Sequence, residues 1–179
     1  MDKETLERAF DLAQNASKLS DCVIRHVGAT LVRDKEILST GNNRSLIHGR
    51  CCDLFSRHDK ENHKIWSSIH EVHAEIDCIN NCAKSGISTN NTEMVITYSP
   101  CTACAQAIIT AGIKKVYMVP ELQEDKIIKK NIGVYLLLTN NIEVEFLDQD
   151  CNTLKAKTQI LIHTILTEVD NMFLQIIPQ

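Results

Sequence analysis

The chain has 179 residues, of which 44% are hydrophobic, and its net charge is −4 at pH 7. This length is sufficient for one well-buried core, so we expect one globular domain. The acidic balance excludes a global positive field that would hold a nucleic-acid backbone, and it leaves room only for a local basic pocket. The first residues lack the apolar core of a signal peptide and no later run approaches membrane-spanning length, so we expect a cytoplasmic protein with neither a membrane nor nucleic acid as its partner.

The predicted elements alternate between helices and strands. In chain order they are a helix at 3–19, strands at 27–32 and 37–40, a helix at 73–86, a strand at 92–99, a helix at 100–112, a strand at 114–119, a mainly helical stretch at 125–141, a strand at 142–147 and a terminal helix. Because helices separate the last three strands, these strands should run parallel, joined by right-handed crossovers. The fold class is therefore α/β, with a five-stranded mixed sheet flanked by helices.

We divide the chain into a domain at 1–150 and a C-terminal helical extension at 151–179. The apolar residues of the extension recur every three or four positions, at Ile162, Ile165, Val169, Met172 and Ile176. This stripe either covers the core or forms a subunit contact.

Residues 42–72 form a polar region that is rich in cysteine and histidine and that we interpret as a long loop. A loop of that length requires a function or an anchor. The chain has eight cysteines, and in a reducing compartment they are more often buried thiols or metal ligands than disulfides. We interpret Cys78, Cys82 and Cys151 as buried small hydrophobic side chains.

The segment "SPCTAC" predicts half of a metal site. Ser99 suits a helix N-cap and Pro100 the first helical position, which places Cys101 and Cys104 on one face of the first turn. The positive end of a helix favours thiolate over thiol, and two thiolates at this spacing suit zinc.

The segment "HAE" supplies the other half. His73 provides a third ligand, which leaves the fourth tetrahedral position for water, and zinc lowers the pKa of such a water to about 7. Glu75 lies two residues further along, where it can take the proton of the water and deliver it to a base. His-x-Glu followed by Pro-Cys-x-x-Cys is the signature of zinc-dependent nucleobase deaminases. The alternatives are a structural zinc site with four ligands, or two buried thiols beside a core histidine.

Several segments resemble the deoxycytidylate (dCMP) deaminases of the T-even bacteriophage type. They are "VGATLV", "STGNN", "CCD", "WSSIHEVHAEIDCI", "VITYSPCTACAQAIITAGIKKV" and "IEVEFLD", and the likeness covers residues 5–148. The resemblance implies a three-layer cytidine-deaminase-like sandwich that converts dCMP to dUMP for dTMP supply, as a homohexamer in the cytoplasm, or in the host cytoplasm if the chain is viral. It also implies that Asn43 contacts the sugar or base and that the backbone at Ala74 and Ser99 meets the pyrimidine edge.

The resemblance further implies a second, structural zinc (Zn²⁺) held by Cys22, Cys51, His63 and Glu71. Spacing alone leaves open a simpler alternative, in which buried cysteines accompany a solvated histidine.

The chain also departs from the family. It reads "GNNRSL" where the family has Gly-Tyr-Asn-Gly-x-Pro, a turn that helps to form the nucleotide and regulatory surface. The sequence therefore leaves open whether activation by dCTP and inhibition by dTTP are retained, and Mg²⁺ is a candidate cofactor only together with such an allosteric nucleotide. Asp77 replaces an asparagine, and Leu122 stands where a tyrosine is common. Arg44 is a candidate phosphate ligand, although most arginines in polar loops are solvated.

Three alternatives compete with the dCMP reaction. A deaminase that edits transfer RNA or single strands needs a basic channel lined by aromatic residues, whereas this chain is acidic with 4% aromatic residues. A different free cytosine nucleotide would use the same zinc chemistry. A purely structural zinc module is disfavoured because such a module gains little from Glu75 beside the metal.

Overall fold

The computed structural model describes residues 1–47, 54–55, 58–120 and 131–174. Its helices are α1 (Lys3–Ser17), α3 (Lys60–His70), α4 (Ala74–Lys84), α5 (Thr102–Thr110), α7 (Ile132–Thr139) and α8 (Lys155–Leu174). Its strands are β1 (Gly28–Arg33), β2 (Glu36–Asn42), β3 (Arg44–Ser45), β4 (Glu71–Val72), β5 (Glu93–Ile96), β6 (Lys115–Met118) and β7 (Glu143–Phe146). In the described part of the chain, no helix is both long and apolar enough to cross a membrane.

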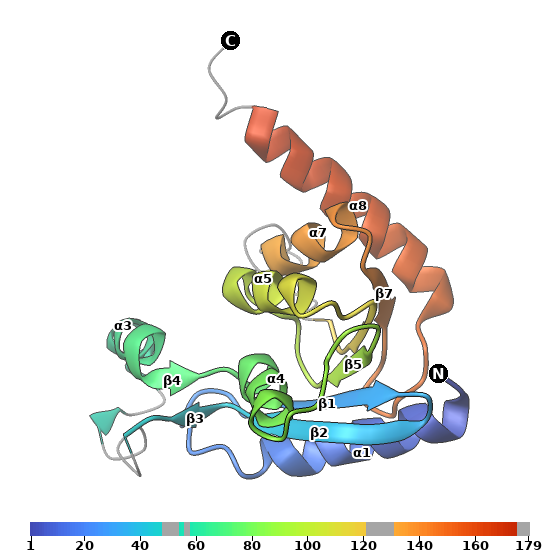
Figure 1. Ribbon diagram of the computed structural model, residues 1–179. Helices are drawn as coiled ribbons and strands as arrows, with labels where there is room; N and C mark the ends of the chain where they lie inside the picture. Colours follow the sequence, from blue (N-terminus) through green and yellow to red (C-terminus); the bar gives the residue numbers. More distant parts are fainter. Residues whose placement is uncertain (48–53, 56–57, 121–130, 175–179) are drawn as a thin grey trace.

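The main sheet has the strand order β2-β1-β5-β6-β7. Strand β1 pairs antiparallel with β2 and β5, whereas β5, β6 and β7 run parallel. The predicted five-stranded mixed sheet with parallel last strands is therefore confirmed. The two-residue strands β3 and β4 form a separate small sheet, which lies with α3 at one end of the molecule (Figure 1).

Side chains alternate between the two faces of the main sheet, as the strand period requires. Val32, Val95 and Tyr117 face α1 and pack with its buried Leu6 and Phe10. The residues on the opposite face pack against α4, α5, α7 and α8, and they include Leu31, Met94, Ile96, Met118 and Phe146. The protein is thus a helix–sheet–helix sandwich. Cys78 and Cys82 are buried as predicted, whereas Cys151 is half-buried.

Helix α8 continues the core and then extends past it. Ile165 and Val169 are buried, and Ile162 and Met172 pack against the same cluster. The stripe therefore covers the core, and α8 runs along α7, with its C-terminal end at the top of the view in Figure 1. Ile176 lies outside the described residues. The division of the chain at residue 150 stays a prediction.

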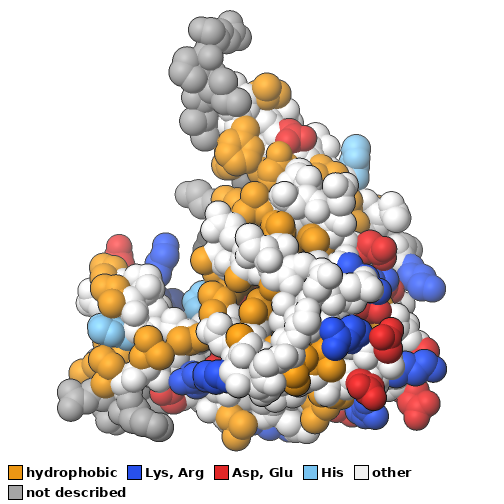
Figure 2. All heavy atoms as spheres, viewed as in Figure 1, with side chains coloured by type: hydrophobic (Ala, Val, Ile, Leu, Met, Phe, Trp, Pro, Cys, Tyr) orange, Lys and Arg blue, Asp and Glu red, His pale blue; other side chains and the backbone are white. Residues whose placement is uncertain are grey.

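The interpretation of 42–72 as a long loop was wrong for its second half, which contains α3 and β4. Ile65 and Ile69 repeat at helical spacing but are 62% and 67% exposed, so they do not form the core-facing stripe that would have indicated a helix. Figure 2 shows hydrophobic side chains on the surface of this lobe. Its inward contact comes from His63, which is buried and lies 3.4 Å from Sγ of Cys22. Trp66 packs within α3, with its ring 5.1 Å from that of His70.

Two glycines allow backbones to approach closely around the ends of α4 and α5. A Cβ atom on Gly41 would lie 2.3 Å from the amide nitrogen of Cys78, and one on Gly133 would lie 2.1 Å from the carbonyl oxygen of Pro100. Both contacts are with backbone atoms, so a side chain at either position would move α4 away from β2, or α7 away from the start of α5.

Candidate active site

Two helix N-termini converge at the site. His73 is the N-cap residue of α4, and its carbonyl accepts from the amide of Asp77 at 2.9 Å. Cys101 is the N-cap residue of α5, and its carbonyl accepts from the amide of Ala105 at 2.9 Å. The expected N-cap role of Ser99 was wrong, because the first helical residue is Thr102 and Ser99 lies two residues before the cap. The positive ends of both helices favour thiolate at this place.

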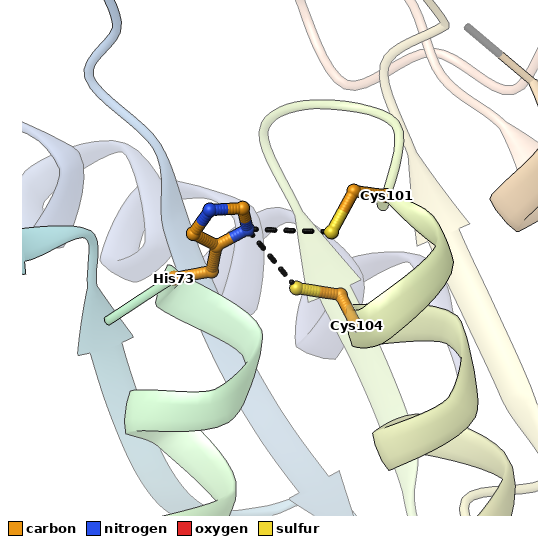
Figure 3. Close-up of side chains that lie close together, drawn as sticks. All are labelled: His73, Cys101 and Cys104. Carbon is orange, nitrogen blue, oxygen red and sulfur yellow. Dashed lines mark hydrogen bonds between the residues drawn. The ribbon is translucent and has the colours of Figure 1, made fainter. Parts of the chain in front are cut away.

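The side chains of His73, Cys101 and Cys104 meet between these helices (Figure 3). The Nδ1 atom of His73 lies 3.4 Å from Sγ of Cys101 and 3.3 Å from Sγ of Cys104. A tetrahedral zinc with bonds of roughly 2.0 Å to nitrogen and 2.3 Å to sulfur separates such ligand atoms by about 3.6 Å. The three residues therefore fit zinc with little movement, and they offer three ligands rather than four.

Hydrogen bonds redistribute protons among these three groups. Bonds from the Cys104 thiol and then from His73 lower the pKa of Cys101 to about 4. The bond to Cys101 raises the pKa of His73 to about 9, although burial opposes this shift. Hydrogen bonding to Cys101 raises the pKa of Cys104. The cluster thus stabilises one thiolate, and zinc binding would displace its remaining protons.

Glu75 lies one residue inside α4 and is 4% exposed. Burial raises the pKa of its carboxyl group, and interaction with His73 only partly offsets this. A carboxyl group whose pKa is raised by burial holds a proton more readily than an exposed glutamate, which is a property of many general acid–base catalysts.

A second group of potential metal ligands joins three distant segments. Donor atoms of Cys22, His63 and Glu71 all lie within 4.8 Å of one another. Sγ of Cys22 is 3.4 Å from Nε2 of His63, and both residues are buried. Cys51 lies outside the described residues. This cluster joins the segment before β1, which carries Cys22, to α3 and β4. The last residue of β4 directly precedes His73.

Asn43 is buried, and its side-chain amide is largely engaged within the protein. Its Nδ2 group donates to the carbonyl of Arg25 at 2.9 Å and to the carboxylate of Glu71, while Oδ1 accepts from the amide of Val27 at 2.8 Å. Asn43 therefore orients a residue of the second cluster as well as the segment before β1. Sequence reasoning missed this network because it depends on long-range packing.

Arg44 pairs with the residue that departs from the family pattern. Its Nε and Nη2 atoms donate to Oδ1 of Asp77 at 3.1 and 2.8 Å, and Oδ2 of Asp77 accepts from the amide of Asn42 at 3.3 Å. Asp77 is 4% exposed, so Arg44 neutralises a buried carboxylate. Ala74 is fully buried at the start of α4, directly after His73, and Ser99 is buried two residues before Cys101. Both residues therefore flank the group formed by the side chains of His73, Cys101 and Cys104.

A mixed α/β sandwich with His-x-Glu and Cys-x-x-Cys at two converging helix N-termini defines the zinc-dependent deaminase class. The chain belongs to the family described as the cytidine and deoxycytidylate deaminase zinc-binding region, whose model matches residues 2–120.

Individual relatives support this assignment. Deoxycytidylate deaminase of Enterobacteria phage T4 is 30% identical over 140 residues, which cover 59% of this chain and 72% of the phage protein. ComE operon protein 2 of Bacillus subtilis is 38% identical over 98 residues, 55% of this chain and only 50% of that protein. The crystal structure of dCMP deaminase from the cyanophage S-TIM5 in apo form superposes with a TM-score of 0.64 at 30% identity, covering 82% of this chain and 100% of the other. The structure of the same enzyme in complex with dCMP and dUMP superposes with a TM-score of 0.60 at 27% identity, covering 82% of this chain and 99% of the other.

Proposed function

We propose that the protein converts dCMP and water to dUMP and ammonia, and so contributes to dTMP supply. The observation that carries this proposal is the buried Glu75 beside the converging His73, Cys101 and Cys104. The likeness to a cyanophage enzyme whose structure contains dCMP and dUMP supports the choice of substrate. We further expect a homohexamer in the cytoplasm, as the family resemblance implies.

His73, Cys101 and Cys104 would hold zinc, which when bound lowers the pKa of water to about 7 and supplies a nucleophile at neutral pH. Glu75 accepts the proton of the attacking water and passes it to the ring nitrogen of the pyrimidine. It then helps to transfer a proton to the departing amino group, which leaves as ammonia. The fixed backbone at Ala74 and Ser99 would position the pyrimidine edge beside Glu75.

The experiment that tests this function is a substrate panel. Zinc-loaded protein is expected to convert dCMP, with the ultraviolet change from cytosine to uracil, at a kcat/KM above those for deoxycytidine, dCTP and CMP. Turnover of a different member of the panel in preference to dCMP would replace the proposed substrate. Deamination of transfer RNA or single-stranded DNA, with all four free compounds inert, would replace the function.

The Cys22–His63–Glu71 cluster leads us to propose a second zinc ion per chain, with Cys51 as a further ligand. Metal analysis of purified protein is expected to give two zinc ions per chain. His63→Ala should reduce this to one and lower the melting temperature, because the cluster joins three segments. The matched control is His163→Ala on the exposed surface of α8, which should keep both ions. One zinc in the unaltered protein would remove the second site without affecting the catalytic one.

A further inference from the structure

We propose that the ion pair between Arg44 and Asp77 is a positioning device for the reaction, because it holds His73 and Glu75 in place from both sides of the junction between β4 and α4. The inference rests on the proposed function and deepens it by assigning two further residues to the same site. Neither residue of the pair touches the reacting atoms. Both act through the backbone that carries His73 and Glu75.

Asp77 fixes the first turn of α4 through its carboxylate. It lies four residues after His73 and two after Glu75, and its side chain is buried. Its Oδ1 atom accepts from Nε and Nη2 of Arg44 at 3.1 and 2.8 Å, and its Oδ2 atom accepts from the amide of Asn42 at 3.3 Å. A buried carboxylate is tolerated only when it is paired and hydrogen-bonded. These contacts therefore hold the first turn of α4 against the end of β2 and against β3.

Arg44 reaches the same junction a second time through its backbone. It pairs with Val72 in the antiparallel ladder of β3 and β4, and Val72 directly precedes His73. The amide of Asp77 donates to the carbonyl of His73 at 2.9 Å, which closes a ring of contacts around His73. The chain thus contacts Arg44 both before and after His73, at the place where β4 leads into α4 (Figure 1).

His73 depends on support of this kind because its side chain is engaged elsewhere. Its Nδ1 atom faces Sγ of Cys101 and of Cys104 at 3.4 and 3.3 Å, and its side chain makes no cap hydrogen bond to α4. Glu75 lies in the same first turn, so a rotation of this turn would move the imidazole and the carboxyl group together. A displacement of about 1 Å can lower a rate about 10²-fold. A contact that fixes this turn therefore acts on both groups.

The two residues are also departures from the family pattern that complement each other. Arg44 stands where the family turn has its second glycine, and Asp77 stands where the family has an asparagine. Arginine beside a neutral amide, or a buried aspartate beside glycine, would leave one charge at this place. Together the two residues form a neutral pair, so one interaction explains both departures.

The test is a double-mutant cycle with the neutral variants Arg44→Gln, Asp77→Asn and the two combined, measured on dCMP and deoxycytidine well below the melting temperature. Arg44→Gln removes the charge that neutralises the buried carboxylate, so kcat should fall about tenfold on both substrates, with each KM within about twofold. The combined variant removes both charges and should recover kcat to within about threefold of the unaltered protein.

Zinc affinity provides a readout that is independent of catalysis. Competition with a chelator should show that Arg44→Gln weakens zinc binding at His73 by about tenfold, the effect expected when a group that orients a ligand is lost, and that the combined variant recovers it. The binding step that Cys104→Ala abolishes identifies this site. The matched control is Glu145→Gln, which breaks a half-buried pair with Lys115 of 3.0 Å between β6 and β7. The control should lower the melting temperature but keep kcat and zinc affinity.

Three results would overturn the assignment. A lower melting temperature in Arg44→Gln, with kcat and zinc affinity unchanged, would make the pair a purely structural contact. Absence of recovery in the combined variant would mean that the two residues act independently. A rise in KM for dCMP alone would make Arg44 a ligand of the substrate phosphate. If the unaltered protein deaminates neither substrate, the proposed function fails, and the cycle in zinc affinity still decides whether the pair positions His73.

Discussion

Glu75→Gln is expected to lower kcat for dCMP by about 10²- to 10⁴-fold, the usual contribution of a positioned general acid–base catalyst. Glutamine has nearly the same shape but neither accepts nor releases the proton at this step. Glu75 is buried and next to His73, so its carboxyl group acts where water cannot easily replace it. The measurement is steady-state turnover, accompanied by zinc content and melting temperature.

The control for this variant is Glu143→Gln, which removes an exposed carboxylate from β7. It should leave kcat within about twofold, because surface substitutions have small effects. The mechanism would be contradicted if Glu75→Gln kept full activity in folded protein with its zinc. Loss of zinc in this variant would also count against it, because Glu75 would then act as a ligand.

Cys104→Ala is expected to remove one zinc ion and to abolish turnover, lowering it by at least about 10³-fold, because metal activation contributes several kcal/mol and each 1.36 kcal/mol corresponds to tenfold. Sγ of Cys104 lies 3.3 Å from Nδ1 of His73, so its loss breaks a set of only three ligands. Zinc analysis should show that the ion at the Cys22 cluster is kept. Adding zinc in excess should restore little activity.

Cys82→Ala provides a control of equal size. Cys82 and Cys104 are both fully buried, so each replacement leaves a similar small cavity in the core. The control should lose a similar amount of stability but retain its zinc and its turnover. If the two variants behaved alike in both respects, Cys104 would be a core residue and not a ligand.

The proposed catalytic group was predictable because its residues lie in two short motifs, each at the start of a helix. His73 and Glu75 are two residues apart, and Cys101 and Cys104 are three apart, so each pair is set by backbone geometry over less than one turn. The sheet was equally accessible, because β1, β5 and β6 are buried on both faces and therefore appear in the sequence as short, mainly apolar runs. Within this group, only the N-cap was predicted at the wrong residue. It was placed at Ser99 because Pro100 suits the first helical position, whereas the structure has it at Cys101.

The region around α3 could not be predicted in the same way. Ile65 and Ile69 repeat at helical spacing, but they are exposed and the rest of the segment is polar, so this short pattern does not mark a helix that packs on the core. Its buried contact is His63, whose partners come from positions far away in the sequence. The roles of Asn43 and Arg44 were obscured for the same reason, because both depend on long-range hydrogen bonds to Glu71 and Asp77. Gly133 is explained only by the approach of α7 to Pro100.

The most direct test of the account is product formation from dCMP by purified protein, with and without prior removal of zinc by a chelator. The account predicts one dUMP and one ammonia for each dCMP consumed, loss of this activity on chelation, and its return when zinc is added back. Folded, zinc-loaded protein that leaves dCMP intact, or turnover that persists without the metal, would contradict it.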